Sequence, residues 1–270
     1  MSVHSVSMKG KRARNEDKHE YILNLDENYD TYDPTKAPIN FYAIFDGHGG
    51  QCVSKFLHQN LSQYFMCKEI AKYPLQIGFV EKIYAHLENK LKMNKQTENC
   101  GSTCLIVIHY RDGNSEKLDI LNTGDSRAII CSNNMAIPLT HDHKPNVPSE
   151  KKRIQKLGGT ISWDGYDWRI CDLSLSRSFG DFNAKKYVTS NPDIYRRKLT
   201  KGDKFFVLGC DGLYDCLTNE EIVNFILDKC YDMETGQRIN KNINIAKKLG
   251  EYAINQGSTD NVTALVVFLS

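Results

Sequence analysis

The sequence lacks several features that would place it in a specialised class of proteins. Its 270 residues contain no apolar run near the ~20 residues that a membrane-spanning helix needs. The segment Met1–Arg14 is polar and basic, so no apolar core of a secretory signal is visible. Lys and Arg number 35 against 33 Asp and Glu. This near-neutral balance removes the bulk argument for binding nucleic acid or an anionic membrane.

Cysteine is present but shows no pattern of a metal or redox site. The nine cysteines are scattered, and no C-x-x-C pair exists, so a zinc ribbon or a thioredoxin-type motif has no support. Cys104 and Cys131 lie inside apolar runs, where a free thiol acts as a small hydrophobic group. We therefore expect free thiols in a reducing compartment, namely the cytoplasm, with the nucleus as an alternative.

Apolar runs bounded by Gly, Asp or Asn predict most of the strands. The predicted strands are residues 21–25, 41–45, 103–110, 117–122, 127–131, 204–210 and 262–269. Between two of them, Arg111–Asn114 is typical of a hairpin turn. The polar segment Asn24–Asn40, punctuated by two prolines, is predicted to be a loop.

Apolar residues at three- and four-residue steps predict the helices. They cover Val53–Phe65 and Val80–Leu91, and others begin near Ser149, after the capping box Thr218–Glu221, and at Ile243. Helices come in succession before several strands instead of alternating with them, which favours an α+β fold with a largely antiparallel sheet. Because no repeat or linker is visible, the whole chain, 1–270, is predicted to form a single domain.

Carboxylates stand where the predicted strands end or join. Asp46 follows one apolar strand and Asp211 follows another, and Asp260 comes just before the last strand. Asp125 lies between two strands, and Glu16–Asp17 precede a further one. One Asp-Gly pair after a strand is usually only a turn. The carboxylates of five such junctions would repel one another if they met at one edge of the predicted sheet. Bound cations would relieve this repulsion.

The residue types at these junctions point to a chemistry. Oxygen ligands without paired histidines or cysteines favour Mg²⁺ or Mn²⁺ over zinc, and Gly47 would leave its backbone carbonyl free to approach such an ion. Two ions a few ångströms apart can lower the pKa of a water, which supplies a hydroxide for in-line attack on a phosphate. Arg12 or Arg14 is a candidate for a phosphate clamp, and His48 for the acid that protonates the leaving oxygen. Phosphoester hydrolysis is therefore the predicted reaction class.

A series of short motifs covers nearly the whole chain, from Gly10 to Phe268. The motifs are Gly10-Lys-Arg-Ala-Arg-Asn-Glu-Asp17, Phe41-Tyr-Ala-Ile-Phe-Asp-Gly-His-Gly-Gly50, Gly101-Ser-Thr103, Asn122-Thr-Gly-Asp-Ser-Arg127, Asp142-His-Lys-Pro145, Glu150 with Arg153-Ile154 and Gly158-Gly159, Leu175-Ser-Arg-Ser-Phe-Gly-Asp181, Cys210-Asp-Gly-Leu-Tyr-Asp215 and Gly257-Ser-Thr-Asp-Asn-Val262. In this order, the series resembles the protein phosphatase 2C family of metal-dependent serine/threonine phosphatases, also called the PPM type. One motif would be weak evidence, whereas the ordered series is highly specific.

The resemblance implies a fold and a reaction. The fold is α+β, a central sandwich of two antiparallel β-sheets flanked by antiparallel α-helices in four αββα layers, with the metals at one end. The reaction is hydrolysis of phosphoserine or phosphothreonine in phosphorylated protein substrates by in-line attack of a metal-bridging hydroxide. We expect two Mg²⁺ or Mn²⁺ ions per site, no nucleic-acid partner, no membrane span and a monomer.

The resemblance also implies metal ligands, residue by residue. Asp46 matches the carboxylate that bridges both metals, and Gly47 matches the backbone carbonyl ligand of one of them. Asp211 and Asp260 match the other ligands of the second metal. Glu16–Asp17 match acids that act through metal-bound waters.

Three further residues match other parts of the family's site. Arg12 rather than Arg14 matches the phosphate-binding arginine, because it lies four residues before Glu16. His48 matches the proposed general acid. Asp125 matches a ligand of a weaker third metal that some members show. The segment 182–193 matches the flap region but looks short, so substrate choice does not carry over.

Two other functions remain open on the sequence alone. A dinuclear metallophosphoesterase of the other common architecture begins with Gly-Asp-x-His-Gly, to which Asp46–His48 is a near miss. The Gly-Asn-His-Glu piece of that family and its histidine ligands are absent. A non-enzymatic phosphopeptide-binding scaffold would need lost metal ligands, whereas every matched ligand is present.

The remaining conspicuous residues have plainer interpretations. His141 and His143 are expected to be structural, and Asp181 to fix a turn. Trp163 and Trp168 are expected in core packing rather than at a substrate surface.

Overall fold

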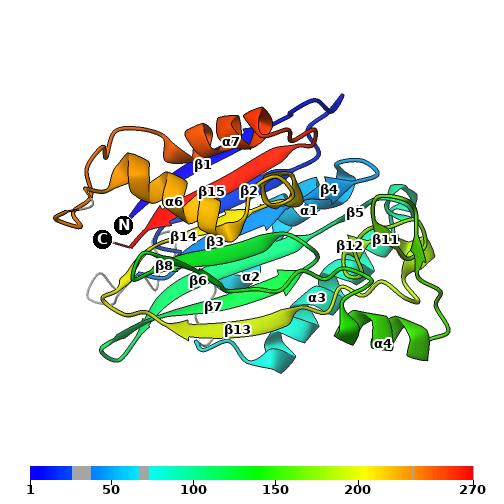
Figure 1. Cartoon of the computed structure of the whole chain (residues 1–270). Helices are drawn as coiled ribbons and strands as arrows, with labels where there is room; N and C mark the ends of the chain where they lie inside the picture. Colours follow the sequence, from blue (N-terminus) through cyan, green and yellow to red (C-terminus); the bar gives the residue numbers. More distant parts are fainter. Residues whose placement is uncertain (26–37, 67–72, 233, 270) are drawn as a thin grey trace.

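The computed structural model describes residues 1–25, 38–66, 73–232 and 234–269, and its centre is a pair of stacked five-stranded antiparallel sheets (Figure 1). The first sheet runs in the order β1 (Ser2–Met8), β15 (Val262–Phe268), β14 (Asp203–Gly209), β8 (Arg127–Ser132) and β9 (Met135–Pro138). The second runs in the order β13 (Asp193–Lys198), β7 (Ser115–Thr123), β6 (Cys104–Asp112), β3 (Asn40–Phe45) and β2 (Lys18–Ile22).

Two small sheets and the helices surround this sandwich. One small sheet joins β12 (Phe179–Gly180), β5 (Gly101–Ser102) and β4 (Gly47–His48), and the other is the hairpin of β10 (Ser162–Trp163) and β11 (Trp168–Arg169). The helices are α1 (Cys52–Asn60), α2 (Gln63–Met66), α3 (Ile77–Lys92), α4 (Pro148–Lys156), α5 (Asp211–Tyr214), α6 (Asn219–Cys230) and α7 (Ile245–Asn255), with short 3₁₀ helices η1 (Lys95–Thr97) and η2 (Phe182–Ala184). Within the described ranges, no helix is long and apolar enough to cross a bilayer.

Alternation of side chains along the central strands builds the layers. In β3, Phe41 and Phe45 pack against α1 and α3, whereas Tyr42 and Ile44 pack between the two sheets. In β14, alternate residues likewise face α6 and α7 or the opposite sheet. Because side chains in a strand point to opposite faces in turn, a strand buried on both faces reads as a continuous apolar run. The predicted four-layer α+β sandwich is thus confirmed, with α7 and α6 on one side and α3 on the other (Figure 1).

The sequence predicts most elements correctly and misses those without an apolar run. Each predicted helical region contains a helix, but the helix predicted over Val53–Phe65 is divided into α1 and α2. Thr218 and Glu221 form the predicted capping box. The strand predicted at 21–25 instead spans Lys18–Ile22. Three longer strands were missed, β1, β9 and β13, whose residues are only half-buried or exposed. The two-residue strands β4, β5, β10, β11 and β12 were not predicted either. The predicted loop 24–40 lies largely outside the described residues.

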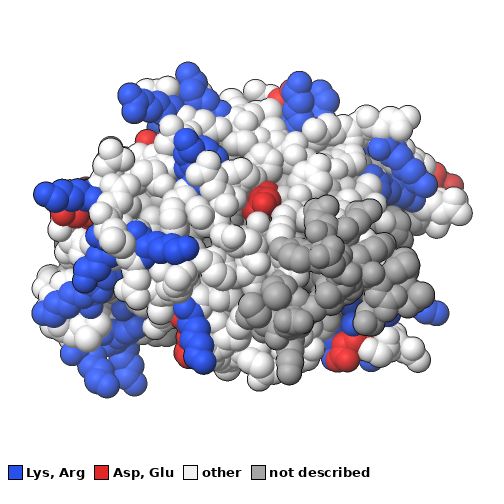
Figure 2. Space-filling view, turned by 180° about the vertical axis from the view of Figure 1, so that it is seen from behind, with Lys and Arg blue, Asp and Glu red and all other residues white. Residues whose placement is uncertain are grey.

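Two features of the surface bear on function. Trp163 and Trp168 are 53% and 40% exposed, so the prediction that they belong to the core is wrong. They contact each other across the β10–β11 hairpin, with ring centroids 5.6 Å apart. Seen from behind, Lys and Arg side chains lie mainly around the margin of the molecule rather than in one stripe across it (Figure 2).

Candidate active site

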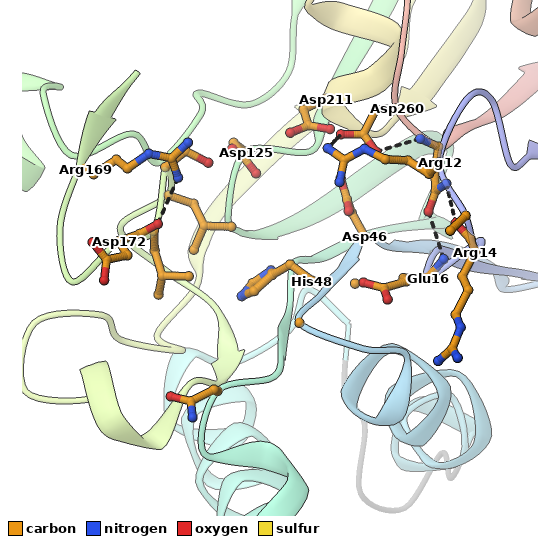
Figure 3. Close-up of a pocket in the computed structure, with 18 residues that line it drawn as sticks. Arg12, Arg14, Glu16, Asp46, His48, Asp125, Arg169, Asp172, Asp211 and Asp260 are labelled. Carbon is orange, nitrogen blue, oxygen red and sulfur yellow. Dashed lines mark hydrogen bonds and ion pairs between the residues drawn. The ribbon is translucent and has the colours of Figure 1, made fainter. Parts of the chain in front are cut away.

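A cavity of about 530 Å³ lies at the end of the sandwich where several strands start or finish (Figure 3). Asp46 follows β3, Asp211 comes two residues after β14, and Asp260 lies just before β15. All three line this cavity together with Asp125, which lies between β7 and β8, and with His48 of β4. The carboxylates that the sequence places at separate strand ends therefore meet in one place.

Backbone contacts hold these strand ends together. The N–H of Asp46 donates to Thr103 Oγ1 at 3.0 Å, and its carbonyl accepts from the N–H of Thr103 at 2.8 Å. At Gly212, a Cβ would lie 2.0 Å from the carbonyl oxygen of Asn261. Only glycine therefore allows α5 to approach the chain that enters β15, and this close approach brings Asp211 beside Asp260.

The carboxylates at the centre of the cavity disfavour one another's charge. Burial raises the pKa of Asp46 well above its usual range, and the charges of Asp211, Asp17 and further aspartates add to this effect. Burial, with the charges of Asp125 and Asp215, raises the pKa of Asp211 to about 8. Desolvation and like charges both penalise the ionised form, so these groups need a compensating cation to be fully charged at neutral pH.

Two further carboxylates belong to this region, Glu16 in the cavity wall and Asp17 behind it. Asp17 is buried and accepts a hydrogen bond from Thr263 Oγ1 at 2.6 Å, but its Oδ1 atom is buried without a partner. Burial raises the pKa of Asp17 to about 6. Glu16 lines the cavity, and its carboxylate accepts from the N–H of Gly50 at 3.1 Å. Gly47 also lines the cavity, so every predicted ligand except the buried Asp17 lines it.

Cys210 lies close enough to take part in the cluster, but its thiol is already engaged. Three possible ligand atoms, one each from Asp46, Cys210 and Asp211, lie within 4.8 Å of one another. The Sγ atom of Cys210 accepts from the N–H of Thr263 at 3.1 Å and donates to the carbonyl of Asn261 at 3.4 Å. Burial raises the pKa of this thiol well above its usual range. The donors left for a cation are carboxylate oxygens, which suit a hard divalent ion such as Mg²⁺ or Mn²⁺.

Arg12, predicted to grip phosphate, is paired with a predicted metal ligand in this structure. Its guanidinium lies 2.5 Å from Asp260 Oδ2, and its side chain is 61% exposed. Arg14 also lines the cavity, but its guanidinium points away from the aspartates (Figure 3). The structure therefore brings Arg12 rather than Arg14 to the carboxylate cluster.

Asp125 has a cation of its own. Lys144 Nζ lies 2.6 Å from Asp125 Oδ2, which is almost fully buried. Burial alone would lower the pKa of Lys144, but the charge of Asp125, with Asp211 and Asp215, raises it above its usual value. Lys144 thus stays charged, and it holds the oxygen that the sequence assigns to a third metal.

His48 lines the cavity and pairs with Asp181, Nε2 to Oδ2, at 2.7 Å. Burial alone would lower the pKa of His48, but the hydrogen bond and the charge of Asp181 outweigh it, so the pKa is raised. Asp181 has a φ of 49° at the start of η2, which confirms the predicted turn. Its contact with His48 was not predicted, because 133 residues separate the two and no local pattern connects them.

The wall opposite the aspartates comes from residues that the sequence did not single out. Arg169 at the end of the tryptophan hairpin and the segment Asp172–Ser174 line this side, next to Leu175 of a motif that the sequence did show (Figure 3). His143 is structural, as predicted, since it accepts a hydrogen bond from the N–H of Gly124. The signal for the wall would have been the position of residues 172–174 just before the motif Leu175–Asp181.

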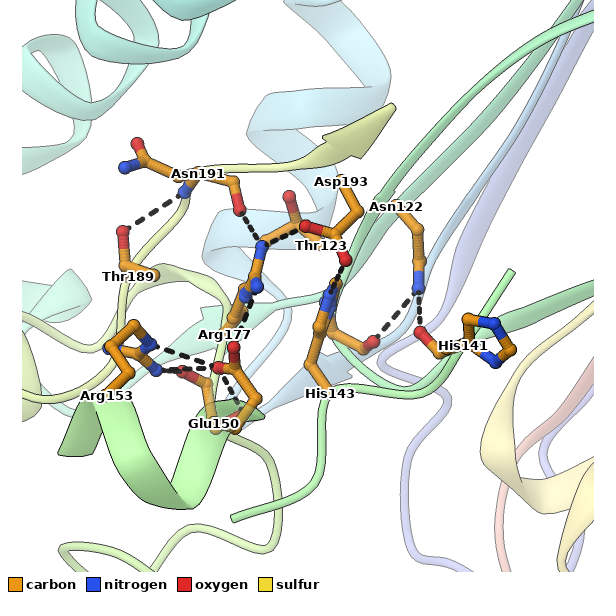
Figure 4. A network of polar contacts seen from close by, with 12 residues as sticks. Asn122, Thr123, His141, His143, Glu150, Arg153, Arg177, Thr189, Asn191 and Asp193 are labelled. Carbon is orange, nitrogen blue, oxygen red and sulfur yellow. Dashed lines mark hydrogen bonds and ion pairs between the residues drawn. The ribbon is translucent and has the colours of Figure 1, made fainter. Parts of the chain in front are cut away.

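A buried ionic network fixes this wall (Figure 4). Glu150 on α4 pairs with Arg153 and Arg177, each at 2.7 Å, and accepts from Ser176 Oγ at 2.8 Å. Arg177 also pairs with Asp193 at 2.8 Å. Burial alone would raise the pKa of Glu150, but the hydrogen bonds and charges of the two arginines lower it to about 2. Glu150 is therefore a fully compensated charge that ties the cavity wall to α4.

Glu150→Gln should destabilise the protein at neutral pH by roughly 3 kcal/mol, because it leaves two arginines without their buried partner. The folded pKa of Glu150, about 2, lies below its ordinary value of 4.5, so its stabilisation is present above that value. It is lost as pH falls from about 4.5 to 2. Chemical denaturation from pH 7 to 3 should show the wild type converging on the variant. Glu251→Gln removes an exposed pair on α7 and should change stability by less than about 0.5 kcal/mol. A constant gap across this range would contradict the ionic role of Glu150.

Asp211→Asn should stabilise the metal-free protein at pH 8 by roughly 1–3 kcal/mol. The folded pKa of about 8 lies above the ordinary 3.8, so folded protein holds a proton that unfolded protein has lost. The free energy of unfolding of chelator-treated wild type should therefore fall as pH rises from about 4 to 8. The free energy of unfolding of the variant should fall less over the same range. Asp228→Asn, at an exposed site on α6, is the control and should follow the wild type. Parallel curves for wild type and Asp211→Asn would show that the pKa of Asp211 is not raised.

Comparison with known proteins adds an independent line of evidence. The family model described as protein phosphatase 2C matches residues 1–262. The chain is 34% identical to protein phosphatase 1L of Bos taurus, over 98% of this chain and 72% of that protein. It is 35% identical to the integrin-linked kinase-associated serine/threonine phosphatase 2C of Homo sapiens, over 96% of this chain and 70% of that protein.

A solved structure shares the fold. The serine-threonine phosphatase 2C from Toxoplasma gondii superposes with a TM-score of 0.77 at 22% identity, over 98% of this chain and 94% of that chain. The likeness in fold, the family model and the identity to these two relatives agree. The chain therefore belongs to the protein phosphatase 2C family of metal-dependent protein serine/threonine phosphatases.

Proposed function

We propose that this chain removes phosphate from phosphoserine and phosphothreonine residues of proteins at the cavity lined by Asp46. The observation that carries the proposal is the meeting of Asp46 and Asp211, which have no Lys or Arg partner among the described residues, with Arg12 and His48 in a single cavity. A cluster of carboxylates favours the binding of a cation. The guanidinium of Arg12 beside it favours a ligand with negative charge, such as a phosphate group that contacts both the cation and the protein. A histidine beside them suits an ester whose leaving oxygen needs a proton.

Two Mg²⁺ or Mn²⁺ ions fit the donor set. Asp46, at the centre of the cluster, would serve both ions, with the backbone carbonyl of Gly47 as a further donor to one. Asp211 and Asp260 would complete the second position, and Glu16–Asp17 would add charge from the wall. The unpartnered buried oxygen of Asp17 supports this arrangement, because such an atom is costly unless a cation or its water lies near. When bound, the ions would lower the pKa of a water and so supply the hydroxide that attacks phosphorus.

A third ion at Asp125 would be the weakest. The ammonium of Lys144 already compensates Asp125, so an added cation would have to share or displace it. Asp46 and Asp211 have no Lys or Arg partner among the described residues, so a cation gains more there. We infer that any third site fills only at high metal concentration.

Arg12 would grip the phosphate. Its planar guanidinium can donate two parallel hydrogen bonds to phosphate oxygens. In this structure it donates to Asp260 instead, from an exposed and therefore adaptable side chain. A cation on Asp260 and a phosphate on Arg12 would each replace that pair, so the two ligands favour one another.

The surroundings of the cavity support a protein substrate. The cavity lies beside the exposed tryptophan hairpin, which gives a peptide chain a surface to follow. On the face that Figure 2 shows, the basic side chains do not form one stripe such as a nucleic-acid backbone would need. We also propose a monomer in the cytoplasm, with the nucleus as an alternative, since the described cysteines are free thiols.

The test of the function is an assay on a phosphothreonine peptide with and without metal. Chelation should abolish phosphate release, because none of the proposed catalytic residues is itself a nucleophile. Added Mn²⁺ or Mg²⁺ should restore the activity. Full turnover in excess chelator, after metal analysis has verified removal, would overturn the proposal.

Arg12→Ala should lower kcat/KM on the phosphopeptide by roughly 10–100-fold, since hydrogen bonds to charged groups contribute roughly 1.5–3 kcal/mol. Its metal affinity should not fall, because the guanidinium competes with cations for Asp260. Arg14→Ala is the matched control, and calorimetric metal titration is the second measurement. If Arg14→Ala gave the larger loss, the assignment of the phosphate-binding arginine would be wrong by two residues.

A further inference from the structure

His48 is held by a carboxylate that does not itself line the cavity. His48 lies in β4, and Asp181 lies at the turn between β12 and η2, with Nε2 and Oδ2 at 2.7 Å. The side chain of Asp181 is only 3% exposed, whereas that of His48 is 26% exposed and faces the cavity (Figure 3). Ser178 Oγ donates to the same Oδ2 atom at 2.5 Å. The carboxylate of Asp181 is thus committed to contacts inside the protein.

The turn that carries Asp181 is fixed on both sides. Its N–H donates to the carbonyl of Cys100 at 3.1 Å. The Nζ atom of Lys185 donates to the carbonyls of Ser178 and Gly180 at 2.9 and 2.8 Å. Asp181 itself has a left-handed backbone, with a φ of 49°. Such a conformation persists only where neighbouring contacts enforce it, so the position of this carboxylate is imposed by the fold.

Gly101 of β5 leaves the space in which the pair forms. A Cβ on Gly101 would lie 2.0 Å from Asp181 Oδ2 and 2.4 Å from His48 Nε2. Any side chain there would occupy the space between the two groups. The absence of a side chain at Gly101 is therefore a requirement of the contact between His48 and Asp181, independent of the turn.

The contact determines which ring nitrogen of His48 can meet a substrate. An imidazole has two nitrogens, and a hydrogen bond at one sets the role of the other. Nε2 is occupied by Asp181. Nδ1 is the nitrogen that remains for a ligand in the cavity.

We propose that Asp181 is a positioning residue, which holds the ring of His48 so that Nδ1 delivers a proton to the leaving oxygen of the phosphoester. The proposal rests on the proposed function. Asp181 acts through His48 and touches no substrate atom itself. It therefore affects only the part of the reaction that depends on the proton.

The step balances without a further reactant. As water oxygen forms a bond to phosphorus, the bond from phosphorus to the seryl or threonyl oxygen breaks, and its electron pair stays on that oxygen. The oxygen takes the proton from Nδ1, which gives the alcohol and leaves His48 neutral. The attacking water loses one proton to solvent and keeps the other in the product, hydrogen phosphate, and His48 regains one proton from solvent before the next turnover. The carboxylate of Asp181 keeps its hydrogen bond to the Nε2 proton throughout.

The simpler alternative is that Asp181 only fixes the turn. A structural role would slow every substrate alike, through misplaced cavity walls or lost metal. A positioning role slows only substrates whose leaving group needs a proton. A phosphothreonine peptide has such a leaving group, whereas the p-nitrophenolate of p-nitrophenyl phosphate is stable as an anion.

The experiment compares both substrates on metal-saturated wild type, Asp181→Asn, His48→Gln and the double variant. Asparagine tolerates the left-handed conformation, so Asp181→Asn should keep the turn. Asp172→Asn is the matched control, because Asp172 also has a positive φ, of 66°, and lines the cavity without contacting His48. Thermal melting and metal titration on each variant show that fold and metal are retained. Gly101→Ala is the second route to the same defect, because it moves both groups and leaves the carboxylate in the sequence.

Asp181→Asn should lower peptide turnover by roughly 10–100-fold, as part of the ~10²–10⁴-fold that general acid catalysis typically contributes. Turnover of p-nitrophenyl phosphate should fall less than about threefold. In the His48→Gln background, Asp181→Asn should cost nothing further. Asp172→Asn should leave the ratio of the two rates unchanged. Nitrogen-15 NMR of histidine in the metal-free protein should place the proton on Nε2 in wild type and redistribute it in Asp181→Asn.

Equal losses on the two substrates would overturn the positioning role, and so would a full additional loss in the His48→Gln background. An unchanged histidine spectrum in Asp181→Asn would do the same. Each of these results leaves the proposed function intact, provided that wild type hydrolyses the peptide. If wild type itself released no phosphate from the peptide with metal present, the function would fail instead.

Discussion

Repulsion among the carboxylates that meet at Asp46 is the constraint on which the rest of the structure depends. Burial and four other aspartates raise the pKa of Asp46, and Asp211 beside it has a pKa of about 8. Such a cluster opposes folding in the absence of cations. Other interactions must therefore supply the free energy that keeps the protein folded. The central strands β3 and β14 are buried on both faces, between helices and the opposite sheet. Apolar burial of this extent is the dominant favourable contribution to folding, and it allows the strand ends to carry like charges.

Basic side chains of the protein compensate the outer carboxylates of the cluster but not the central ones. Arg12 pairs with Asp260, and Lys144 pairs with Asp125. Within the described residues, no Lys or Arg pairs with Asp46 or Asp211. An added divalent ion therefore gains most at the centre, where no ammonium or guanidinium has to be displaced. The pair of Arg12 with Asp260 also bears on the proposed phosphate site, since a cation on Asp260 would leave the guanidinium of Arg12 without this partner.

The sequence predicts the parts of this arrangement that are local. Apolar runs followed by aspartate show both the strands and the carboxylates at their ends, and the ordered motifs show the family. Three features of the structure could not be predicted from the sequence, each for a physical reason. β1 carries alternating polar residues and is half-buried throughout, so it has no apolar run to detect. Trp163 and Trp168 are exposed on a hairpin, and aromatic character alone does not say which face a side chain takes. The contact of His48 with Asp181 depends on two elements that only the folded chain brings together.

The carboxylates of this site differ in whether a basic side chain of the protein compensates their charge. Glu150 is matched by Arg153 and Arg177 at hydrogen-bonding distance, so its pKa falls and its charge stabilises the cavity wall. Asp211 is unmatched, so its pKa rises and its charge is available to a ligand. Asp181 stands between these cases, because its partner is a titratable ring rather than a permanent cation. A carboxylate fixed by the fold and paired with such a ring can hold a proton in place without neutralising itself. The position of Asp181 behind the cavity wall therefore suits a group that directs a proton and does not bind the metal.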